Sequence, residues 1–225
     1  IDSPSVQNLN IDGSLRCMEA AGLLGCQVFM DAGSRVEYGI TADGTMEESM
    51  ECHPVNEYGK AKLAFFEQAK QLCRELQLTY YHLRFFSVDG KGDHPWSIIS
   101  TLTRELPEGK TVSLSACRHR WNFMDIEDAS RAVVELYRYS DSHRGECHAV
   151  NVASEDTRVL RDFVEEILNY CKRSRKTVYR RAAYRKAVYG ITGLPSTGKT
   201  TGLLQAIRKL AAYEKCVYIS FDRKT

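Results

Sequence analysis

Helical and strand-like hydrophobic patterns alternate along most of the chain. Apolar residues recur at helical spacing, which predicts helices, over 6–24, 57–77, 95–105, 126–139 and 158–170. Short apolar runs predict buried strands at 27–30, 79–86, 111–115 and 149–152. Residues 31–34 are expected to form a turn after the first strand, and 41–54 an irregular acidic loop. Strands that alternate with helices at this spacing indicate an α/β fold with a largely parallel sheet.

Composition places the chain among ordinary globular proteins. Of its 225 residues, 43% are hydrophobic and 27% are charged. The net charge of +2 is too small to suggest that the whole chain binds nucleic acid or membranes. No apolar run is long enough to predict a membrane span. Eight cysteines without a Cys-x-x-Cys pair favour reduced thiols in a cytoplasmic protein.

Tyr58 and Lys62 form the first candidate catalytic pair. They are four residues apart near the start of a predicted helix, so their side chains share one face. A nearby ammonium stabilises a phenolate and lowers the pKa of the tyrosine, which makes it a usable general acid/base. Alone, this spacing is also typical of an exposed tyrosine on a solvated helix.

Further motifs stand around this pair in a fixed order. Ser34 begins Ser-Arg-Val-Glu-Tyr-Gly, and Tyr58 lies in Asn-Glu-Tyr-Gly-Lys-Ala-Lys. Leu-Arg-Phe-Phe at 83–86, Trp-Asn-Phe-Met-Asp-Ile-Glu-Asp at 121–128 and Ala-Val-Asn-Val-Ala-Ser at 149–154 follow. Over about residues 6–170 the ordered set resembles the extended short-chain dehydrogenase/reductase family, in particular its NAD-dependent epimerase/dehydratase branch.

The resemblance implies a role for each motif. Tyr58 would be the catalytic acid/base, while Lys62 would hold the nicotinamide ribose of NAD or NADP and depress the tyrosine pKa. Ser34 would hydrogen-bond the reacting oxygen of a nucleotide-sugar substrate. The segment from Phe85 to Ser87 would border the nicotinamide and the substrate. The implied chemistry is hydride transfer at a sugar carbon.

Some positions depart from the family pattern. Dehydratases of this branch usually carry Asp-Glu directly after the catalytic hydroxyl residue, and Arg35 and Val36 stand there. An epimerase or reductase is therefore favoured. The arginine that often grips the substrate diphosphate aligns with Trp121, so Arg118 and Arg120 are the candidate substitutes. Ser87 replaces a common asparagine.

The glycine turn of the family's dinucleotide site has no counterpart before Ser34. Residues 1–170 are therefore expected to be an epimerase/dehydratase-like domain without its dinucleotide-binding half, impaired or inactive as it stands. The apolar strand at 27–30 should then lie at an open sheet edge. A homodimer or a complementing chain that supplies the missing strands is a possible partner.

The segment 171–186 is strongly basic. Eight lysines and arginines fall within 172–186, without an acid. The pattern is typical of a solvated linker, and a patch for nucleic acid or an acidic partner is the alternative.

The last segment, 187–225, contains a phosphate-binding motif. Residues 193–200 read Gly-Leu-Pro-Ser-Thr-Gly-Lys-Thr, between a predicted strand at 187–192 and a predicted helix at 199–213. Gly193 and Gly198 would permit the loop, Lys199 would reach the β/γ-phosphates of ATP, and Thr200 would bind Mg²⁺. The segment resembles the start of AAA-type P-loop ATPases.

The sequence thus predicts a partial Rossmann-like, doubly wound parallel sheet followed by a P-loop strand–helix–strand unit. Two alternatives remain open. In one, the chain is an ATP-binding P-loop module with residues 1–170 as scaffold or interaction domain. In the other, the C-terminal strands and helix are the first dinucleotide-binding unit of a circularly permuted enzyme, with Asp222 as its acidic residue.

Overall fold

The computed structural model describes residues 3–41, 45–140, 145–174 and 190–191. Its helices are α1 (Pro4–Leu23), the 3₁₀ helix η1 (Arg35–Tyr38), α2 (Glu57–Glu75), α3 (Ile98–Glu105), α4 (Ile126–Tyr139) and α5 (Leu160–Ser174). Its strands are β1 (Val28–Ser34), β2 (Thr79–Phe85), β3 (Ser87–Asp89), β4 (Arg120–Asp125), β5 (Cys147–Ala153), β6 (Thr157–Val159) and β7 (Gly190–Ile191). The residues of the P-loop, 193–200, lie outside the described ranges.

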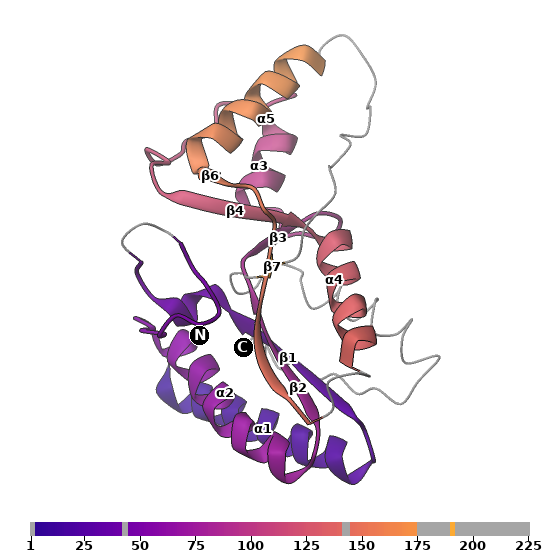
Figure 1. Cartoon of the computed structure of the whole chain (residues 1–225). Helices are drawn as coiled ribbons and strands as arrows, with labels where there is room; N and C mark the ends of the chain where they lie inside the picture. The colour runs from indigo at the N-terminus through magenta and orange to yellow at the C-terminus, as the bar shows by residue number, and fades with distance from the viewer. Residues whose placement is uncertain (1–2, 42–44, 141–144, 175–189, 192–225) are drawn as a thin grey trace.

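The main sheet has the strand order β1-β2-β5-β7. Strands β1, β2 and β5 are parallel, as the sequence pattern predicts, and β7 pairs antiparallel with β5. Within the described residues β1 is the edge strand, as expected for the apolar run at its start. A smaller sheet, β3-β4-β6, lies beyond the carboxyl ends of β1 and β2 (Figure 1).

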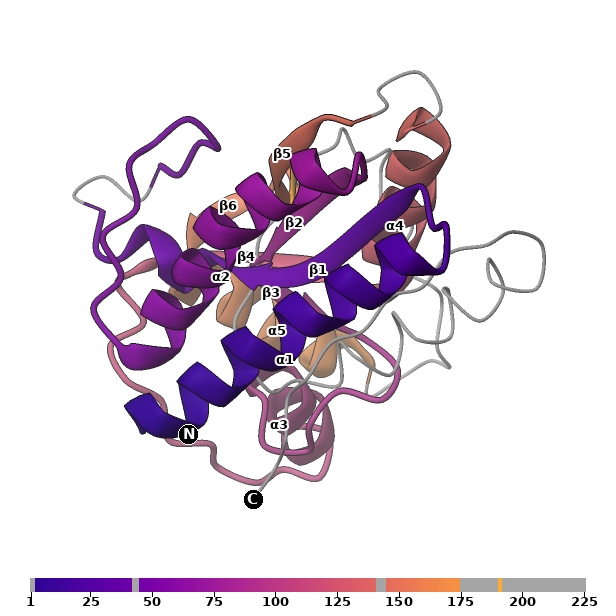
Figure 2. The same cartoon turned by 90° about the horizontal axis from the view of Figure 1, so that it is seen from below.

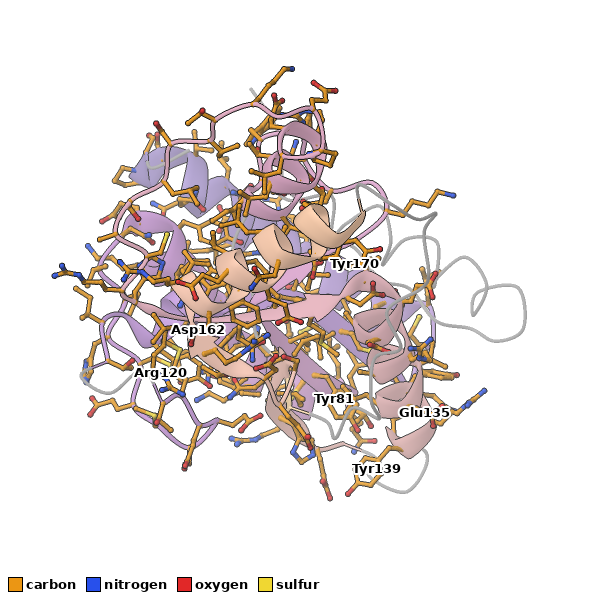
Figure 3. All side chains as sticks on the ribbon, turned by 90° about the horizontal axis from the view of Figure 1, so that it is seen from above. Tyr81, Arg120, Glu135, Tyr139, Asp162 and Tyr170 are labelled. Atoms are coloured by element: carbon orange, nitrogen blue, oxygen red, sulfur yellow. The ribbon has the colours of Figure 1, made fainter. Side chains whose placement is uncertain are left out.

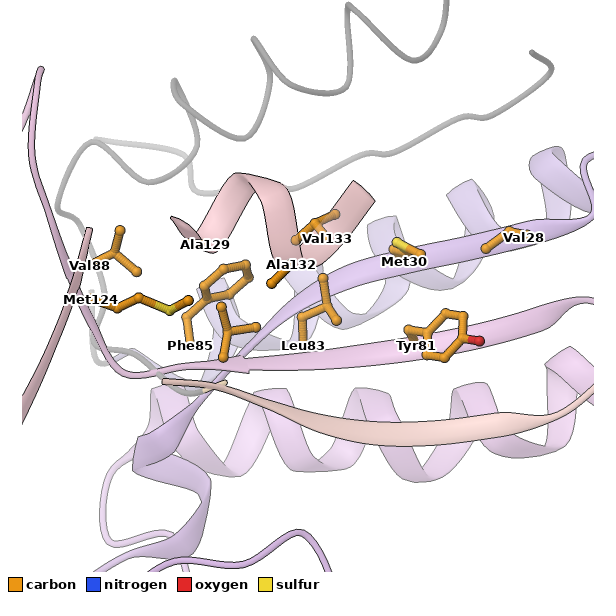
Figure 4. Close-up of a cluster of buried hydrophobic side chains, with 11 residues drawn as sticks. Val28, Met30, Tyr81, Leu83, Phe85, Val88, Met124, Ala129, Ala132 and Val133 are labelled. Carbon is orange, nitrogen blue, oxygen red and sulfur yellow. The ribbon is translucent and has the colours of Figure 1, made fainter. Parts of the chain in front are cut away.

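Helices cover both faces of the main sheet, which confirms the doubly wound arrangement. α1 and α2 lie side by side across one face (Figure 2). Between them and the sheet is a buried cluster that includes Met18, Phe29, Phe65 and Tyr80. α4 covers the other face, where Ala129, Ala132 and Val133 meet side chains of β1 and β2 (Figure 4). Each large apolar side chain buried in these layers contributes about 1.5–3 kcal/mol.

Local sequence explains where the helices that frame the site begin. The side chain of Asn56 accepts a hydrogen bond from Gly59 N at 2.8 Å, which caps the N-terminus of α2. Asp125 caps α4 in the same way through Glu127 N at 2.7 Å. Pro4 opens α1 at a position where a missing N–H costs nothing.

The structure corrects several local predictions. The expected turn at 31–34 is the second half of β1, because Asp31 and Ser34 are buried polar residues with partners inside the fold. The expected strand at 111–115 is absent, and the segment is mostly exposed. Strand β4 forms instead at 120–125, and α5 continues beyond residue 170 to Ser174. The helices of the described ranges include none long and apolar enough to cross a membrane.

Candidate functional site

Ser34 stands at the carboxyl end of β1, where the chain turns into η1. Its side chain accepts a hydrogen bond from Val36 N at 3.5 Å, while its own N–H donates to Glu37 Oε1 at 2.6 Å. This reciprocal capping box locks the start of η1. The Ser34 residue is 1% exposed. The backbone around the predicted substrate-binding hydroxyl is therefore fixed before any ligand arrives.

Tyr58 and Lys62 lie on one face of α2, as predicted. The Nζ atom of Lys62 is 5.5 Å from the centre of the Tyr58 ring. Both residues line a small cavity of about 20 Å³ together with Gln7, Asn10 and Asp31. Tyr58 is largely buried, so the ammonium and the phenol face each other at the edge of the protein interior rather than in bulk water.

Gly59 brings α2 against the segment that contains Ser34. A Cβ atom at this position would lie 2.9 Å from the carbonyl oxygen of Val36 and 2.9 Å from Pro54 Cβ. Only glycine permits so close an approach of helix and loop. Since Gly59 follows Tyr58 directly and Val36 N is bonded to Ser34 Oγ, this contact sets the spacing between the two candidate catalytic residues.

Replacing Gly59 by alanine should therefore destabilise the protein, although alanine normally stabilises a helix by about 1 kcal/mol relative to glycine. We expect the free energy of unfolding to fall by about 1–3 kcal/mol, as for overpacking. The control is Gly13→Ala in α1, where nothing lies within 4 Å of the new Cβ and stability should rise. Urea titrations measure both. Equal gains in the two variants would contradict this interpretation of the contact.

A buried charge cluster supports this corner of the fold. His82, on β2, is fully buried between Asp31 and Glu37, with Nδ1 2.9 Å from Asp31 Oδ1 and Nε2 2.9 Å from Glu37 Oε2. Arg84 Nε donates to Glu37 Oε2 at 3.0 Å, and Arg84 Nη1 donates to Tyr38 Oη at 3.0 Å. The charges of the two carboxylates are thus neutralised by those of His82 and Arg84, and buried charges are tolerated in a fold when they are paired in this way.

The charges of this cluster shift each other's titration. Burial alone would lower the pKa of His82, but the carboxylates of Asp31 and Glu37 raise it to about 9. Burial would raise the pKa of Glu37, yet the charges of His82 and Arg84 and the hydrogen bonds to it hold that pKa below its ordinary value. His82 is therefore a protonated donor to both carboxylates at neutral pH.

The cluster also fixes the loop that follows η1. Tyr38 Oη donates to Asn151 Oδ1 at 2.5 Å. Asn151 in turn donates to the loop, through N to Glu48 Oε1 at 2.8 Å and through Nδ2 to Met46 O at 3.2 Å. Met46 lines the larger cavity described next.

A cavity of about 670 Å³ opens between η1, the loop after it, the end of β2 and the start of β4. Its lining residues are Arg35, Gly39, Ile40, Thr41, Met46, Phe86, Ser87, Arg118, His119, Arg120, Trp121, Asn122 and Thr157. This volume suits a nucleotide-sized ligand. Among the described residues, the charged side chains of the lining are basic, so this part of the cavity attracts an anion.

The structure brings only some of the predicted site residues to this cavity, and Ser34, Tyr58 and Lys62 are not among its lining residues. Ser87, Arg118 and Arg120 line it. Phe85 does not, because its side chain belongs to the core under α4, and its neighbour Phe86 takes the place at the cavity wall. Figure 3 shows Arg120 on the side of the molecule away from Glu135 and Tyr139 of α4, in agreement with a cavity that α4 does not reach.

Sequence reasoning did not identify Glu37, His82 and Arg84. Strand β2 gives a signal that could have found two of them, because Tyr80, His82 and Arg84 alternate with Tyr81, Leu83 and Phe85. Polar residues at every second position of a strand that is buried on both faces require buried partners.

Comparisons with known proteins agree with this fold. A family model described as the NAD dependent epimerase/dehydratase family matches residues 2–153. No curated protein sequence matches the chain at a significant level. The structure of MoeE5 in complex with UDP-glucose and NAD is 27% identical, with a TM-score of 0.62, over 72% of this chain and 54% of that one.

Two other solved structures share the fold. UDP-N-acetylglucosamine 4-epimerase from Methanobrevibacter ruminantium M1, in complex with UDP-N-acetylmuramic acid, is 21% identical over 72% of this chain and 53% of that one, with a TM-score of 0.64. A double mutant of DesIV, a dTDP-glucose 4,6-dehydratase from Streptomyces venezuelae with NAD bound, is 17% identical over 92% and 67%, with a TM-score of 0.61. The chain spans about half the length of the first two structures.

Proposed function

We propose that this chain, which belongs to the NAD-dependent epimerase/dehydratase family, serves an NAD(P)-dependent epimerase or reductase that acts on a nucleotide-activated sugar. The observation that supports this most directly is the basic cavity of about 670 Å³ that begins one residue after Ser34. Solved relatives of the fold bind UDP-sugars and NAD. Two were solved with sugars that carry a carboxylate, UDP-glucuronic acid and UDP-N-acetylmuramic acid.

In this proposal Tyr58 and Lys62 hold the ribose end of the cofactor. They fit that end, because phenol and ammonium are both hydrogen-bond donors on one helix face, beside a cavity with polar lining from Gln7 and Asn10. When bound, NAD(P) supplies the hydride acceptor. Tyr58 takes the proton of the reacting sugar hydroxyl, and the charge of Lys62 stabilises the phenolate that makes this possible.

The other residues position the sugar and its diphosphate. Ser34 would donate a hydrogen bond to the reacting oxygen, from a backbone held by Glu37. Arg118 and Arg120 would bind the diphosphate as cations. The part of the lining that the structure describes contains no aspartate or glutamate that could protonate a leaving hydroxyl. This favours epimerisation or reduction over loss of water.

Binding and turnover test the proposal. UDP-, dTDP- and GDP-linked hexoses are titrated into the protein with NADH, and C-4 epimerisation or NADH oxidation is followed. Lys62→Met should weaken NADH binding by about 10-fold or more, because a charge-assisted hydrogen bond is lost. Lys60→Met, on the same helix at an exposed position paired with Glu57, is the control. If no nucleotide sugar and no NAD(P)H binds, the proposal fails.

ATP and Mg²⁺ binding at Gly193, Gly198, Lys199 and Thr200 stays a sequence prediction. These residues lie outside the described part of the chain, and the matched family model ends at residue 153. The comparisons therefore give no support for a P-loop ATPase unit. ATP titration of Lys199→Ala against the unmodified chain checks the prediction.

A further inference from the structure

One wall of the large cavity holds a cation that faces aromatic rings instead of an anion. The Cζ atom of Arg35 lies 4.3 Å from the centre of the Trp121 ring and 5.8 Å from that of Phe86. Its Nε atom is buried and has no hydrogen-bond partner among the described residues. Burial lowers the pKa of Arg35, as expected for a guanidinium that has lost water without gaining a carboxylate.

A second donor without a partner stands beside it. The indole Nε1 of Trp121 is buried, and the described part of the chain offers it no acceptor either. A buried N–H that lacks an acceptor is costly, and two at one place are seldom left so without a reason. Both residues line the cavity. The missing acceptor is therefore expected on the ligand.

We propose that this wall binds a carboxylate on the sugar of the substrate, so that the substrate class is nucleotide-linked acidic sugars such as uronic acids, with Arg35 as the residue that determines this specificity. The inference rests on the proposed function and names its substrate more closely. A guanidinium matches a carboxylate with two parallel hydrogen bonds. The contact with the Trp121 ring holds the guanidinium at the cavity wall, where such a ligand would meet it.

The position of Arg35 favours the sugar over the diphosphate. Ser34 is in register with Phe85 across β1 and β2, so Arg35 and Phe86 both follow directly after the reacting end of the site. Arg118 precedes β4 and Arg120 begins it, in the same segment that supplies Trp121. These two cations match the two charges of a diphosphate, and Arg35 is a third cation that matches one more negative charge.

The test compares UDP, UDP-glucose and UDP-glucuronate by calorimetric titration of the whole chain with NADH present. The two sugars differ at C-6 only. We expect the unmodified protein to bind UDP-glucuronate about 10-fold or more tightly than UDP-glucose. Arg35→Gln should abolish this preference and change the affinities for UDP and UDP-glucose by less than about 3-fold. Trp121→Phe, which keeps an aromatic ring but removes the indole N–H, should reduce the preference in part.

Matched variants separate the possible roles of the arginines. Arg118→Gln should lower the affinity for all three ligands by a similar factor, because each ligand carries the diphosphate. Arg131→Gln, an exposed residue of α4 paired with Asp128, should change none. Thermal unfolding of each variant verifies the fold.

Three results would overturn the inference while leaving the proposed function intact. In the first, Arg35→Gln weakens the binding of all three ligands equally. In the second, Arg35→Gln leaves the affinity for every ligand unchanged. In the third, the unmodified protein binds UDP-glucose more tightly than UDP-glucuronate. If neither the UDP-linked sugars nor their dTDP and GDP counterparts bind, the proposed function fails together with the inference.

Discussion

Replacing His82 by glutamine will lower the free energy of unfolding at pH 6.5 by about 3–5 kcal/mol, as measured by urea titration. The imidazolium donates to Asp31 and Glu37 in a fully buried position. A neutral side chain there removes the cation that pairs with both carboxylates and leaves Glu37 paired with Arg84. Breaking such a pair costs more than the pair itself contributes, because a buried charge remains uncompensated.

The raised pKa of His82 also predicts how the free energy of unfolding depends on pH. The pKa of His82 is about 9 in the folded chain and 6.5 when unperturbed, so the folded state holds the proton more tightly. Its contribution is complete below pH 6.5 and is lost as pH rises through 9, which amounts to about 3 kcal/mol at 1.36 kcal/mol per pKa unit. The pKa of Glu37 is lowered, so its contribution is present above its ordinary value of 4.5 and is lost at more acidic pH.

His82→Gln should therefore remove the loss of stability between pH 6.5 and 9. The control is His148→Gln on β5, since His148 is partly exposed and pairs with Glu146 at the surface. The free energy of unfolding of this variant should stay within about 0.5 kcal/mol of that of the unmodified protein. An unchanged alkaline slope in His82→Gln would show that His82 does not hold the proton there.

Tyr58→Phe should reduce kcat/KM for nucleotide-sugar turnover by about 10³-fold, within the usual range for loss of a general acid/base. The substitution removes one oxygen and keeps the buried ring, so the packing of α2 is preserved. NADH affinity should fall less than in Lys62→Met, because Lys62 remains to hold the ribose. The measurement is initial rates together with NADH titration.

Tyr139→Phe is the matched control, since this tyrosine is 54% exposed at the end of α4, away from both cavities. Its rate should equal that of the unmodified protein. A Tyr58→Phe variant that keeps more than about a tenth of the activity would exclude Tyr58 as the acid/base.

Elements with a long, regular hydrophobic period could be predicted from the sequence. The face of α2 through Phe66, Ala69 and Cys73 packs into the core as the pattern indicates. The three-residue strands β3 and β6 could not, because each exists only through pairing with β4, which is distant in sequence. The predicted strand at 111–115 was wrong because Val112 and Leu114 alternate with polar residues as in a strand, but the segment pairs with no strand of the described sheets.

The candidate site was predictable to a similar degree. Tyr58 and Lys62 follow a motif that is local in sequence, and the structure places them on one face of α2, while Ser34 lies at the end of β1. The partners of Arg35 could not be predicted, because Trp121 comes from β4 and Phe86 from the residue between β2 and β3. An arginine in a sequence gives no sign of whether it will meet water, a carboxylate or an indole.

The tether between Asn151 and the loop at Met46 and Glu48 makes the ligand cavity a late product of folding. The two hydrogen bonds join residues 103 and 105 positions apart in the chain. Contacts of such long range form slowly, after local structure is in place. A growing chain that ends before β5 can already contain the loop with Met46, yet it lacks Asn151, which holds that loop at the cavity wall. Ligand binding should thus report the completed fold, and hydrogen exchange in the loop should slow only when β5 has joined the sheet.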